Sequence, residues 1–529
     1  MLGLKHRPIR RHSPYTRLLL LFSILGPGII AANADNDAGG IYQYSLAGAQ
    51  FGFGMLWVLV LITISLAVCQ EMGARMGAVT GKGLADLIRE EYGVRVTLFA
   101  MATLLIANYA TTVSEFAGIS AAVEIFAPAW CAGIAHNLIH PIFHVTPQIL
   151  LNPDWAKGII RWIAVPTTAL GVWLLVTRGT YKRVERILLF ASLIYLSYIV
   201  SAVMANPPWP TVLHQTVAPD WHSVKIDREY VFMVIALIGT TITPWGQFYI
   251  QSSVRDKGVR PEEYRLTRID VLFGAFFTNF IAFFIIVCCG VTLYHAGAKP
   301  NFDDAGQIAV ALKPFLKNGH FATLLFAFGL FNASCFGAIT VPLSTAYAIT
   351  ESLGSESGVG RRTREAPMFV SVFAFQLIVA ALTVLLGGGK LSALIILPNI
   401  VGGVLLPIVL VLTLRLINEK RLMGNFTNSR TFNVIAIVTT LVVITLSLIL
   451  LVQTVRDNLF PARKQAQSPF HDNARGQFAA AQDRSTGEGT IRSQLPSAVH
   501  TIAMCQASMA PGFGTRFRSR VTIWPSGTY

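Results

Sequence analysis

Charged residues are scarce in this sequence. Asp, Glu, Lys and Arg make up only 13% of the 529 residues, whereas hydrophobic residues make up 53%. Soluble domains carry about twice that share of charge, roughly a quarter of their residues, so the composition excludes an ordinary soluble fold. Apolar runs recur from Leu18 to Val452, and runs of about 18 residues can cross the roughly 30 Å hydrocarbon layer of a bilayer as helices. The sequence therefore predicts an all-α protein that crosses the membrane many times.

Cysteine is sparse as well. The six cysteines show neither the close pairs of a metal site nor the spacing of a disulfide framework. We expect those within apolar runs to be buried small hydrophobic residues. They have no histidine nearby, and no nucleophile–base pair lies within the apolar runs. The sequence thus predicts a protein that is not an enzyme and has no cofactor.

Polar breaks divide the apolar sequence into eleven expected spans. The first has basic residues before it but no plausible cleavage site after it, so we do not expect a removable signal peptide. The spans lie near residues 18–45, 54–73, 95–120, 159–177, 186–205, 230–252, 270–294, 321–346, 367–387, 393–415 and 432–454.

The 42 lysines and arginines are distributed unequally between the two sides of these spans. Twenty-five lie before span 1 or after spans 2, 4, 6, 8 and 10, eight lie on the other side, and nine follow the last span. Basic loops stay in the cytoplasm. We therefore expect a multi-pass protein of the cell inner (plasma) membrane with a cytoplasmic N-terminus and an extracytoplasmic C-terminus. The net charge of +15 reports this topology and indicates no nucleic-acid partner.

The spans define the expected domain organisation. Residues 1–17 form a cytoplasmic N-terminal segment, and residues 456–529, rich in Gln, Ser, Gly and Arg, form a disordered extracytoplasmic tail. Between them we expect a first transmembrane repeat at 18–205 with helices 1–5, a second at 230–415 with helices 6–10, and an eleventh helix at 432–454.

Two spans contain segments that a continuous membrane helix does not tolerate. Span 1 holds two acids and a glycine pair within residues 33–40, and span 6 holds Pro244 within residues 239–247. Proline removes a backbone donor, and freed backbone groups must be satisfied by protein or water. We therefore expect both helices to be unwound, the alternatives being a polar helix cap in span 1 and a proline kink in span 6. The two spans lie five apart and enter from opposite sides, as in transporters built from inverted repeats.

The unwound segments predict a site for a cation. A buried carboxylate such as Asp37 needs a counter-charge, and no Lys or Arg lies in the middle of any span. Thr240, Thr243 and Gln247 offer oxygen atoms nearby, while neither break contains Met, Cys or His. Oxygen ligands suit Mg²⁺, Ca²⁺ and Mn²⁺ better than softer ions, and Mg²⁺ sheds water reluctantly. A transported divalent cation that keeps much of its water is the expected counter-charge.

Short motifs occur along the chain in a recognisable order. They are residues 26–28, 37–40 and 47–49 with Leu56-Trp57, then Ala107-Asn108 with 114–118, then 181–185, Ile269-Asp270 with Asn279, and 422–426 with Asn428. In order and spacing they resemble the NRAMP family of divalent-metal transporters, over about Leu18 to Val452. The resemblance implies the LeuT-type fold: two inverted five-helix repeats, an eleventh helix, and helices 1 and 6 unwound at mid-membrane.

The resemblance also implies a ligand set, from which this sequence departs. Asp37 falls on the family's metal-binding Asp, Thr240 falls where a backbone carbonyl ligand is expected, and Asn399 falls on a polar residue that completes the site. Gly40 replaces an Asn partner, and Thr243 replaces the thioether Met that favours transition metals. The expected metal ligands are Asp37, Gly40, Thr240, Thr243, Gln247 and Asn399.

Further departures concern proton handling. Trp245 replaces a His, Thr112 replaces an acid, and span 9 has no Arg within its apolar run. This pattern resembles the NRAMP-related magnesium transporters, a branch without the Met ligand and the proton relay. The sequence thus predicts uptake of Mg²⁺, with Mn²⁺ also accepted, by alternating access without proton coupling. A proton-coupled Mn²⁺/Fe²⁺ transporter of the NRAMP type and an amino-acid transporter of the same fold remain alternatives.

Two other acids leave alternatives open. Glu115 in span 3 is expected to be a relic of the proton relay, a hydrogen-bonding group between helices or a second acid near the ion path. Asp35 either binds the ion through water or accepts hydrogen bonds from the unwound backbone. The expected partners are the metal ion, as substrate, and the lipid bilayer. The oligomeric state is left undecided.

Overall fold

The computed structural model describes residues 26–134, 153–219, 227–294, 319–361, 363–387 and 391–459. Every regular element in these ranges is a helix, and all belong to one compact unit, Met1–Phe460. The second unit, Pro461–Tyr529, holds most of the predicted tail and lies outside the described residues.

The first five predicted spans are all helical. Helix α2 and helix α3 occupy span 1, α4 span 2, α5 span 3, α8 span 4, and α9, η2 and α10 span 5, while a short α11 follows in the loop. Their bounds are α2 Pro27–Ala34, α3 Ala38–Phe51, α4 Leu56–Thr80, α5 Leu84–Ile134, α8 Pro153–Arg178, α9 Tyr181–Ser192, η2 Leu193–Tyr195, α10 Leu196–Met204 and α11 Trp209–Val217.

The remaining six spans are helical as well. Helices α12 and α13 occupy span 6, α14 and η3 span 7, and α16, α17, α18 and α20 spans 8 to 11. Their bounds are α12 Arg228–Thr241, α13 Pro244–Lys257, α14 Tyr264–Cys289, η3 Gly290–Tyr294, α16 Gly319–Ser352, α17 Pro367–Leu386, α18 Leu391–Asn418, α19 Lys420–Met423, η5 Gly424–Phe426 and α20 Arg430–Leu459.

Nine helical stretches in the described part of the chain are long and apolar enough to cross a membrane. Span 1 is not among them because it is divided into two short helices, and span 10 contributes the shorter apolar stretch Leu405–Asn418. The chain is therefore a multi-pass membrane protein.

Both predicted interruptions are confirmed. In span 1 the chain leaves the helix after Ala34 and re-enters it at Ala38, and in span 6 it leaves after Thr241 and re-enters at Pro244. Pro244 suits the first position of α13 because the amide that proline lacks has no partner there anyway. Each interruption thus exposes one helix C-terminus and one helix N-terminus inside the protein.

Helix α5 differs from its predicted span. It begins at Leu84, well before residue 95, because Gly93 joins an additional segment to it. Gly93 has φ 77°, a left-handed conformation that glycine adopts without steric cost. The kink redirects the chain at the start of the apolar run.

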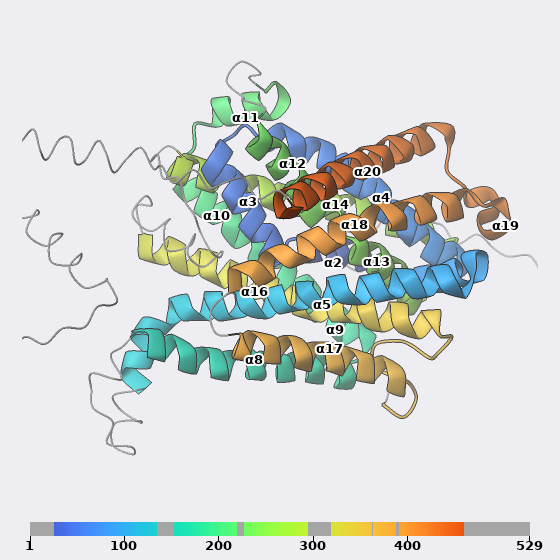
Figure 1. Ribbon diagram of the computed structural model, residues 1–529, viewed down its shortest axis with the longest axis horizontal. Coiled ribbons are helices and arrows are strands. Elements are labelled where there is room, and N and C mark those ends of the chain that lie inside the picture. The colour runs from blue at the N-terminus through green and yellow to red at the C-terminus, as the bar shows by residue number, and fades with distance from the viewer. Residues whose placement is uncertain are drawn as a thin grey trace, which may run out of the picture. The chain divides into compact units, whose positions relative to one another are not determined.

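The helices pack in two groups that meet at the interruptions. Figure 1 shows α5, α8, α16 and α17 running side by side, and contacts join the neighbouring pairs. In the second group, α2 and α4 contact each other and both contact α13 and α14. Because α5 also contacts α3, α13 and α18, it forms a wall against both broken helices.

Candidate functional site

Two acids shape the break in the first span. Asp37 is the N-cap of α3, and its Oδ1 accepts a hydrogen bond from the Gly40 amide at 2.6 Å. A carboxylate is favoured there because the first amides of a helix lack partners within the helix. Asp35, the C-cap of α2, is 1% exposed. The break therefore holds two carboxylates, two residues apart, between opposing helix ends.

Thr243 connects the second break to the first. It is the N-cap of α13, and its Oγ1 accepts a hydrogen bond from the Gly246 amide at 3.2 Å. The same hydroxyl donates to Asp35 Oδ1 at 2.9 Å, and Gln70 Nε2 of α4 donates to Asp35 Oδ2 at 3.1 Å. Asp35 is thus a structural acceptor that links both broken helices to α4.

Neighbouring helices satisfy the backbone groups that the first break frees. The Tyr195 hydroxyl donates to the carbonyl oxygens of Asn33 and Asn36, at 3.2 and 3.1 Å. The Asn36 side chain donates to the carbonyl of Thr278 at 3.0 Å. This explains how an unwound segment is tolerated inside a membrane protein, where unpaired backbone groups are costly.

Asp270 of α14 fixes the start of α2. Its Oδ1 accepts hydrogen bonds from the amides of Gly26 at 2.9 Å and Ile29 at 3.3 Å, and its Oδ2 accepts from the amide of Gly28 at 2.7 Å. These are first-turn amides, which have no partners within the helix. A residue of the second repeat therefore caps the first half of span 1.

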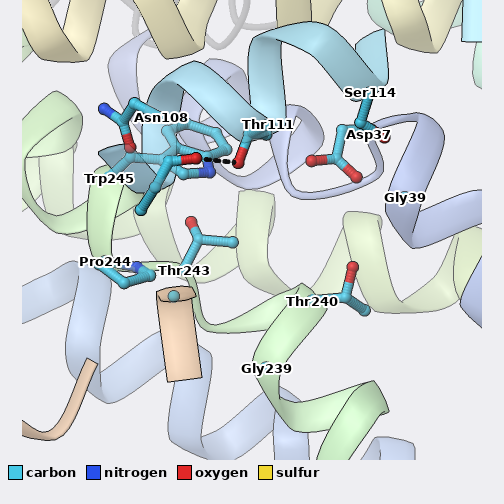
Figure 2. A pocket seen from close by; sticks show the side chains of 12 residues that line it. Asp37, Gly39, Asn108, Thr111, Ser114, Gly239, Thr240, Thr243, Pro244 and Trp245 are labelled. Carbon is cyan, nitrogen blue, oxygen red and sulfur yellow. Dashed lines mark hydrogen bonds between the residues drawn. The ribbon is translucent and has the colours of Figure 1, made fainter. Parts of the chain in front are cut away.

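A small pocket of about 30 Å³ lies where the two breaks face α5. Figure 2 shows Asn108, Thr111 and Ser114 along one side and Thr240 and Thr243 on the other. Asp37 is the one carboxylate among the described residues that line it. The remaining lining is contributed by Trp245, Pro244, Ala107 and the glycines 39, 239 and 402. The pocket thus combines a single negative charge with neutral oxygen atoms.

Among the described residues, no basic side chain compensates the acids buried around the pocket. Glu115 is fully buried beside the pocket, and its Oε2 accepts a hydrogen bond from the Ala38 amide at 3.2 Å. Within the described ranges, no ion pair joins Asp35, Asp37 or Glu115 to a Lys or Arg. Since isolated buried charges are strongly unfavourable, the arrangement suits a mobile cation beside Asp37.

Three of the six predicted ligands line the pocket: Asp37, Thr240 and Thr243. Gly40 lies outside the lining and uses its amide to bind Asp37. Gln247 also lies outside it, one helical turn beyond Thr243, where α13 packs against Gly73 of α4. The backbone of Asn399 belongs to α18, but its side chain lies outside the described part of the structure.

Asn108, Thr111 and Ser114 were not among the predicted site residues. They recur every third position in α5, a spacing that places them along one face of a helix. Polar residues at that spacing in an apolar span are the signal that could have identified this wall.

In the described ranges, no group of three or more His, Cys, Asp or Glu side chains lies close enough to hold a metal. Neutral oxygen atoms therefore dominate the pocket.

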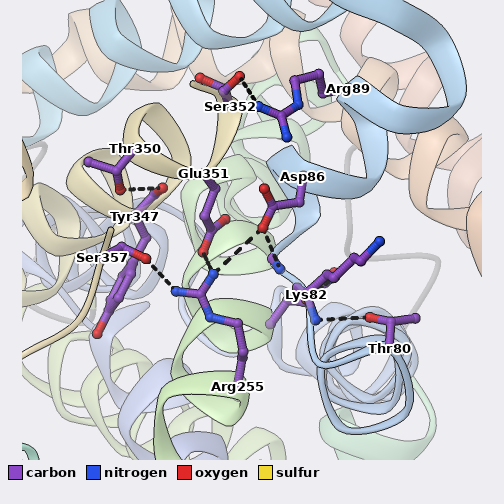
Figure 3. A network of polar contacts seen from close by, with 12 residues as sticks. Thr80, Lys82, Asp86, Arg89, Arg255, Tyr347, Thr350, Glu351, Ser352 and Ser357 are labelled. Atoms are coloured by element: carbon purple, nitrogen blue, oxygen red, sulfur yellow. Dashed lines mark hydrogen bonds and ion pairs between the residues drawn. The ribbon is translucent and has the colours of Figure 1, made fainter. Parts of the chain in front are cut away.

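A second polar cluster joins the C-terminal half of α13 to α5 and α16 (Figure 3). Arg255 lies 3.0 Å from Glu351 Oε1 and 3.6 Å from Asp86 Oδ2, and it donates a hydrogen bond to Ser357 Oγ at 2.5 Å. The Glu351 side chain is only 1% exposed, whereas that of Arg255 is 20% exposed. Arg255 therefore compensates a buried acid and holds the C-terminal half of α13 against α5 and α16.

Replacing Arg255 by methionine is expected to destabilise the protein. The change keeps a long apolar side chain but leaves Glu351 without its counter-charge, which costs about 2 kcal/mol once the partial exposure of Arg255 is allowed for. The measurement is the thermal unfolding midpoint in detergent. The control is Arg361→Met, because Arg361 and its partner Glu356 are 49% and 65% exposed and such pairs contribute less than about 1 kcal/mol. Equal midpoints for the two variants would contradict the role given to Arg255.

Comparisons with known proteins agree with this architecture. The model of the natural resistance-associated macrophage protein-like family matches residues 28–152 and 153–453. A divalent metal cation transporter, MntH 1 of Pseudomonas aeruginosa, is 25% identical over 435 residues, which cover 80% of this chain and 89% of that protein. MntH of Yersinia pestis is 24% identical over 454 residues, which cover 84% of this chain and 97% of that protein.

A solved structure shares the fold. The manganese transporter of Eremococcus coleocola, crystallised with an aromatic bis-isothiourea substituted compound, superposes with a TM-score of 0.67 at 17% identity, over 90% of this chain and 94% of that one. With the two interruptions in place, the expected LeuT-type fold is confirmed: two inverted five-helix repeats, an eleventh helix, and helices 1 and 6 unwound.

Proposed function

Because the chain belongs to the natural resistance-associated macrophage protein-like (NRAMP) family, we propose that it carries divalent metal ions across a membrane. The observation that supports this most directly is the pocket between the two broken helices, where Asp37 is the one lining carboxylate and no described basic side chain pairs with it. A cation that enters the pocket supplies the missing charge. The proposed substrate of the protein is therefore an ion, which the pocket binds transiently during alternating access.

The proposed ions are Mg²⁺, with Mn²⁺ also accepted. The described lining offers carboxylate, hydroxyl and amide oxygen atoms but no thioether, thiol or imidazole. Hard oxygen ligands suit Mg²⁺, whereas sulfur favours softer transition metals. Thr243, which stands where the family resemblance places a Met, caps α13 through its hydroxyl.

Transport is proposed to be driven by the membrane potential and not by protons. The pocket presents Trp245, whose indole does not titrate. Thr112 of α5, which stands where the family resemblance places an acid, accepts a hydrogen bond from Gln376 Nε2 at 2.8 Å. The second candidate is proton-coupled Mn²⁺/Fe²⁺ transport; the solved structure of similar fold is named as a manganese transporter, which supports Mn²⁺ as an ion for this candidate. The distribution of basic residues supports uptake into a cytoplasm that contains the N-terminus, across the inner (plasma) membrane.

Ion flux into liposomes tests this proposal. With an inside-negative potential and purified protein, we expect saturable Mg²⁺ entry that Mn²⁺ competes with, that amino acids leave unchanged, and that causes no internal acidification. Indicator dyes for Mg²⁺ and pH inside the vesicles give both readouts, and protein-free liposomes are the control. Entry of neither metal would refute metal transport, whereas acidification in step with metal entry would favour the proton-coupled candidate.

A further inference from the structure

The polar cluster around Arg255 contains more acids than bases. One guanidinium nitrogen of Arg255 lies 3.0 Å from Glu351 Oε1 and 3.6 Å from Asp86 Oδ2. Asp256, which follows Arg255 in α13, takes part in no ion pair between described residues and accepts a hydrogen bond from the Tyr347 hydroxyl at 2.6 Å. Three carboxylates therefore lie around one guanidinium group.

The other basic side chains in this region do not restore the balance (Figure 3). Lys82 forms an ion pair with Glu90 at 2.6 Å. Arg89 donates a hydrogen bond to the carbonyl of Ser352 at 3.2 Å and forms no ion pair between described residues. Even if Arg89 is counted, the cluster keeps a net negative charge.

Glu351 is the acid of this cluster with the least compensation. Both of its carboxylate oxygens are buried without a hydrogen-bond partner. A Cβ added at Gly83 would lie 1.8 Å from Glu351 Oε2, so this carboxylate lies directly against the backbone at the start of α5. A cation at the position of the Arg255 nitrogen would reach both Glu351 and Asp86, directly or through one water. The two acids thus provide oxygen ligands of the kind that divalent cations such as Mg²⁺ prefer.

A polar cavity of about 380 Å³ adjoins the cluster. It is lined by Arg255 and Asp256 of α13 and by residues 354–357 and 361, which follow α16. The segments after spans 6 and 8 are predicted to be cytoplasmic, so the cavity lies on the predicted cytoplasmic side. It offers the Arg255 side chain two further acids, Asp256 and Glu356.

The cluster lies along the helices that form the pocket. Arg255 is about 18 Å along α13 from Thr243, at the rise of an α-helix. Ser344 of α16 donates a hydrogen bond to the Trp245 carbonyl at the pocket, at 2.8 Å, and Glu351 lies two turns further along the same face of α16. The cluster is therefore placed between the pocket and the predicted cytoplasmic side.

We propose that Glu351 and Asp86 form a second binding site for a divalent cation, and that the ion competes for it with the Arg255 guanidinium. When the ion binds, Arg255 turns into the cavity towards Asp256 and Glu356, and its ties from α13 to α5 and α16 are released. The site goes beyond the proposed function, which assigns only the pocket at the breaks. Its use by an ion on the way to the cytoplasm rests on that function.

Calorimetric Mg²⁺ titration of the purified full chain carrying Asp37→Asn tests the proposal, because this substitution removes the charge of the pocket. Adding Arg255→Met removes the competing guanidinium, so we expect the double variant to bind Mg²⁺ at least about tenfold more tightly than the single variant. Saturating Mg²⁺ should also raise the unfolding midpoint of the double variant in detergent by about 2 °C or more. The ion restores the counter-charge that Glu351 has lost.

Glu351→Gln, added to the double variant, removes the carboxylate and keeps the side-chain shape. Both the tighter Mg²⁺ binding and the rise in unfolding midpoint should then be lost. The matched control is Glu356→Gln in the same background, because the Glu356 side chain is 65% exposed and pairs with Arg361; it should leave Mg²⁺ binding unchanged. If Arg255→Met does not give folded protein, Arg255→Gln takes its place, because its amide still donates to Glu351.

Two results would overturn the proposal. One is Mg²⁺ binding that is no tighter in the double variant than in Asp37→Asn, and the other is binding that survives Glu351→Gln unchanged. None of these measurements involves transport, so they are independent of metal entry into liposomes, which tests the proposed function. Tight Mg²⁺ binding that depends on Glu351, with no metal entry by the wild type, would support the second site and reject transport.

Discussion

Asp37→Asn is expected to abolish saturable metal uptake. The substitution removes the one carboxylate among the described lining residues, while the asparagine oxygen can still accept the hydrogen bond from the Gly40 amide. The break therefore keeps its shape and loses its charge. Losing one desolvated charge interaction costs about 3 kcal/mol, which corresponds to roughly a hundredfold weaker binding. Mg²⁺ entry into liposomes and calorimetric Mg²⁺ binding are the two measurements.

Asp227→Asn provides a matched control. Asp227 is the N-cap of α12 and accepts a hydrogen bond from the Tyr230 amide at 2.9 Å, so it has the capping role of Asp37 but does not line the pocket. We expect the uptake rate of the Asp227→Asn variant to remain within about twofold of the wild type, because asparagine caps a helix about as well as aspartate. Wild-type uptake by Asp37→Asn, or equal loss in both variants, would show that the charge of Asp37 does not bind the ion.

The two breaks could be predicted because their signals are local. Two acids followed by Gly39-Gly40, and Pro244 directly after Thr243, cannot continue a helix in an apolar span, whatever surrounds them. The capping roles of Asp37 and Thr243 follow the same local rule, since an acid or threonine before a helix start satisfies its first amides.

The partners of these residues could not be predicted because they lie far away in the sequence. Asp270 caps a helix more than 240 residues earlier, and nothing near either residue indicates that pairing. Gln247 was expected at the site from its closeness to Thr243, but one turn of helix carries it from the break to the packing surface against α4. Asn108 and Ser114 were missed because polar residues inside a span more often bridge helices than face a pocket.

Gly28→Ala is expected to lower both stability and transport. A Cβ at Gly28 would lie 2.5 Å from the Val271 amide nitrogen and 2.6 Å from Val271 Cα, so it would meet backbone atoms of α14 that cannot rotate away. Helix α2 would have to move, which lengthens the three hydrogen bonds from its first amides to Asp270. Overpacking of this kind costs about 1–3 kcal/mol.

The sign of the stability change decides this prediction. Alanine normally stabilises a helix interior by about 0.5–1 kcal/mol relative to glycine. The control is Gly171→Ala in α8, where the added Cβ would meet nothing within 4 Å, and this variant should show that gain in stability or no change. Gly28→Ala should instead unfold at a lower temperature in detergent and transport Mg²⁺ at least about tenfold more slowly. Transport slows because α2 leads into the first break, so that a displacement of α2 moves Asp37 away from α5. If both alanine variants were as stable and active as the wild type, α2 would not depend on its close contact with α14. The position of the carboxylate in the pocket would then be set by α3 alone.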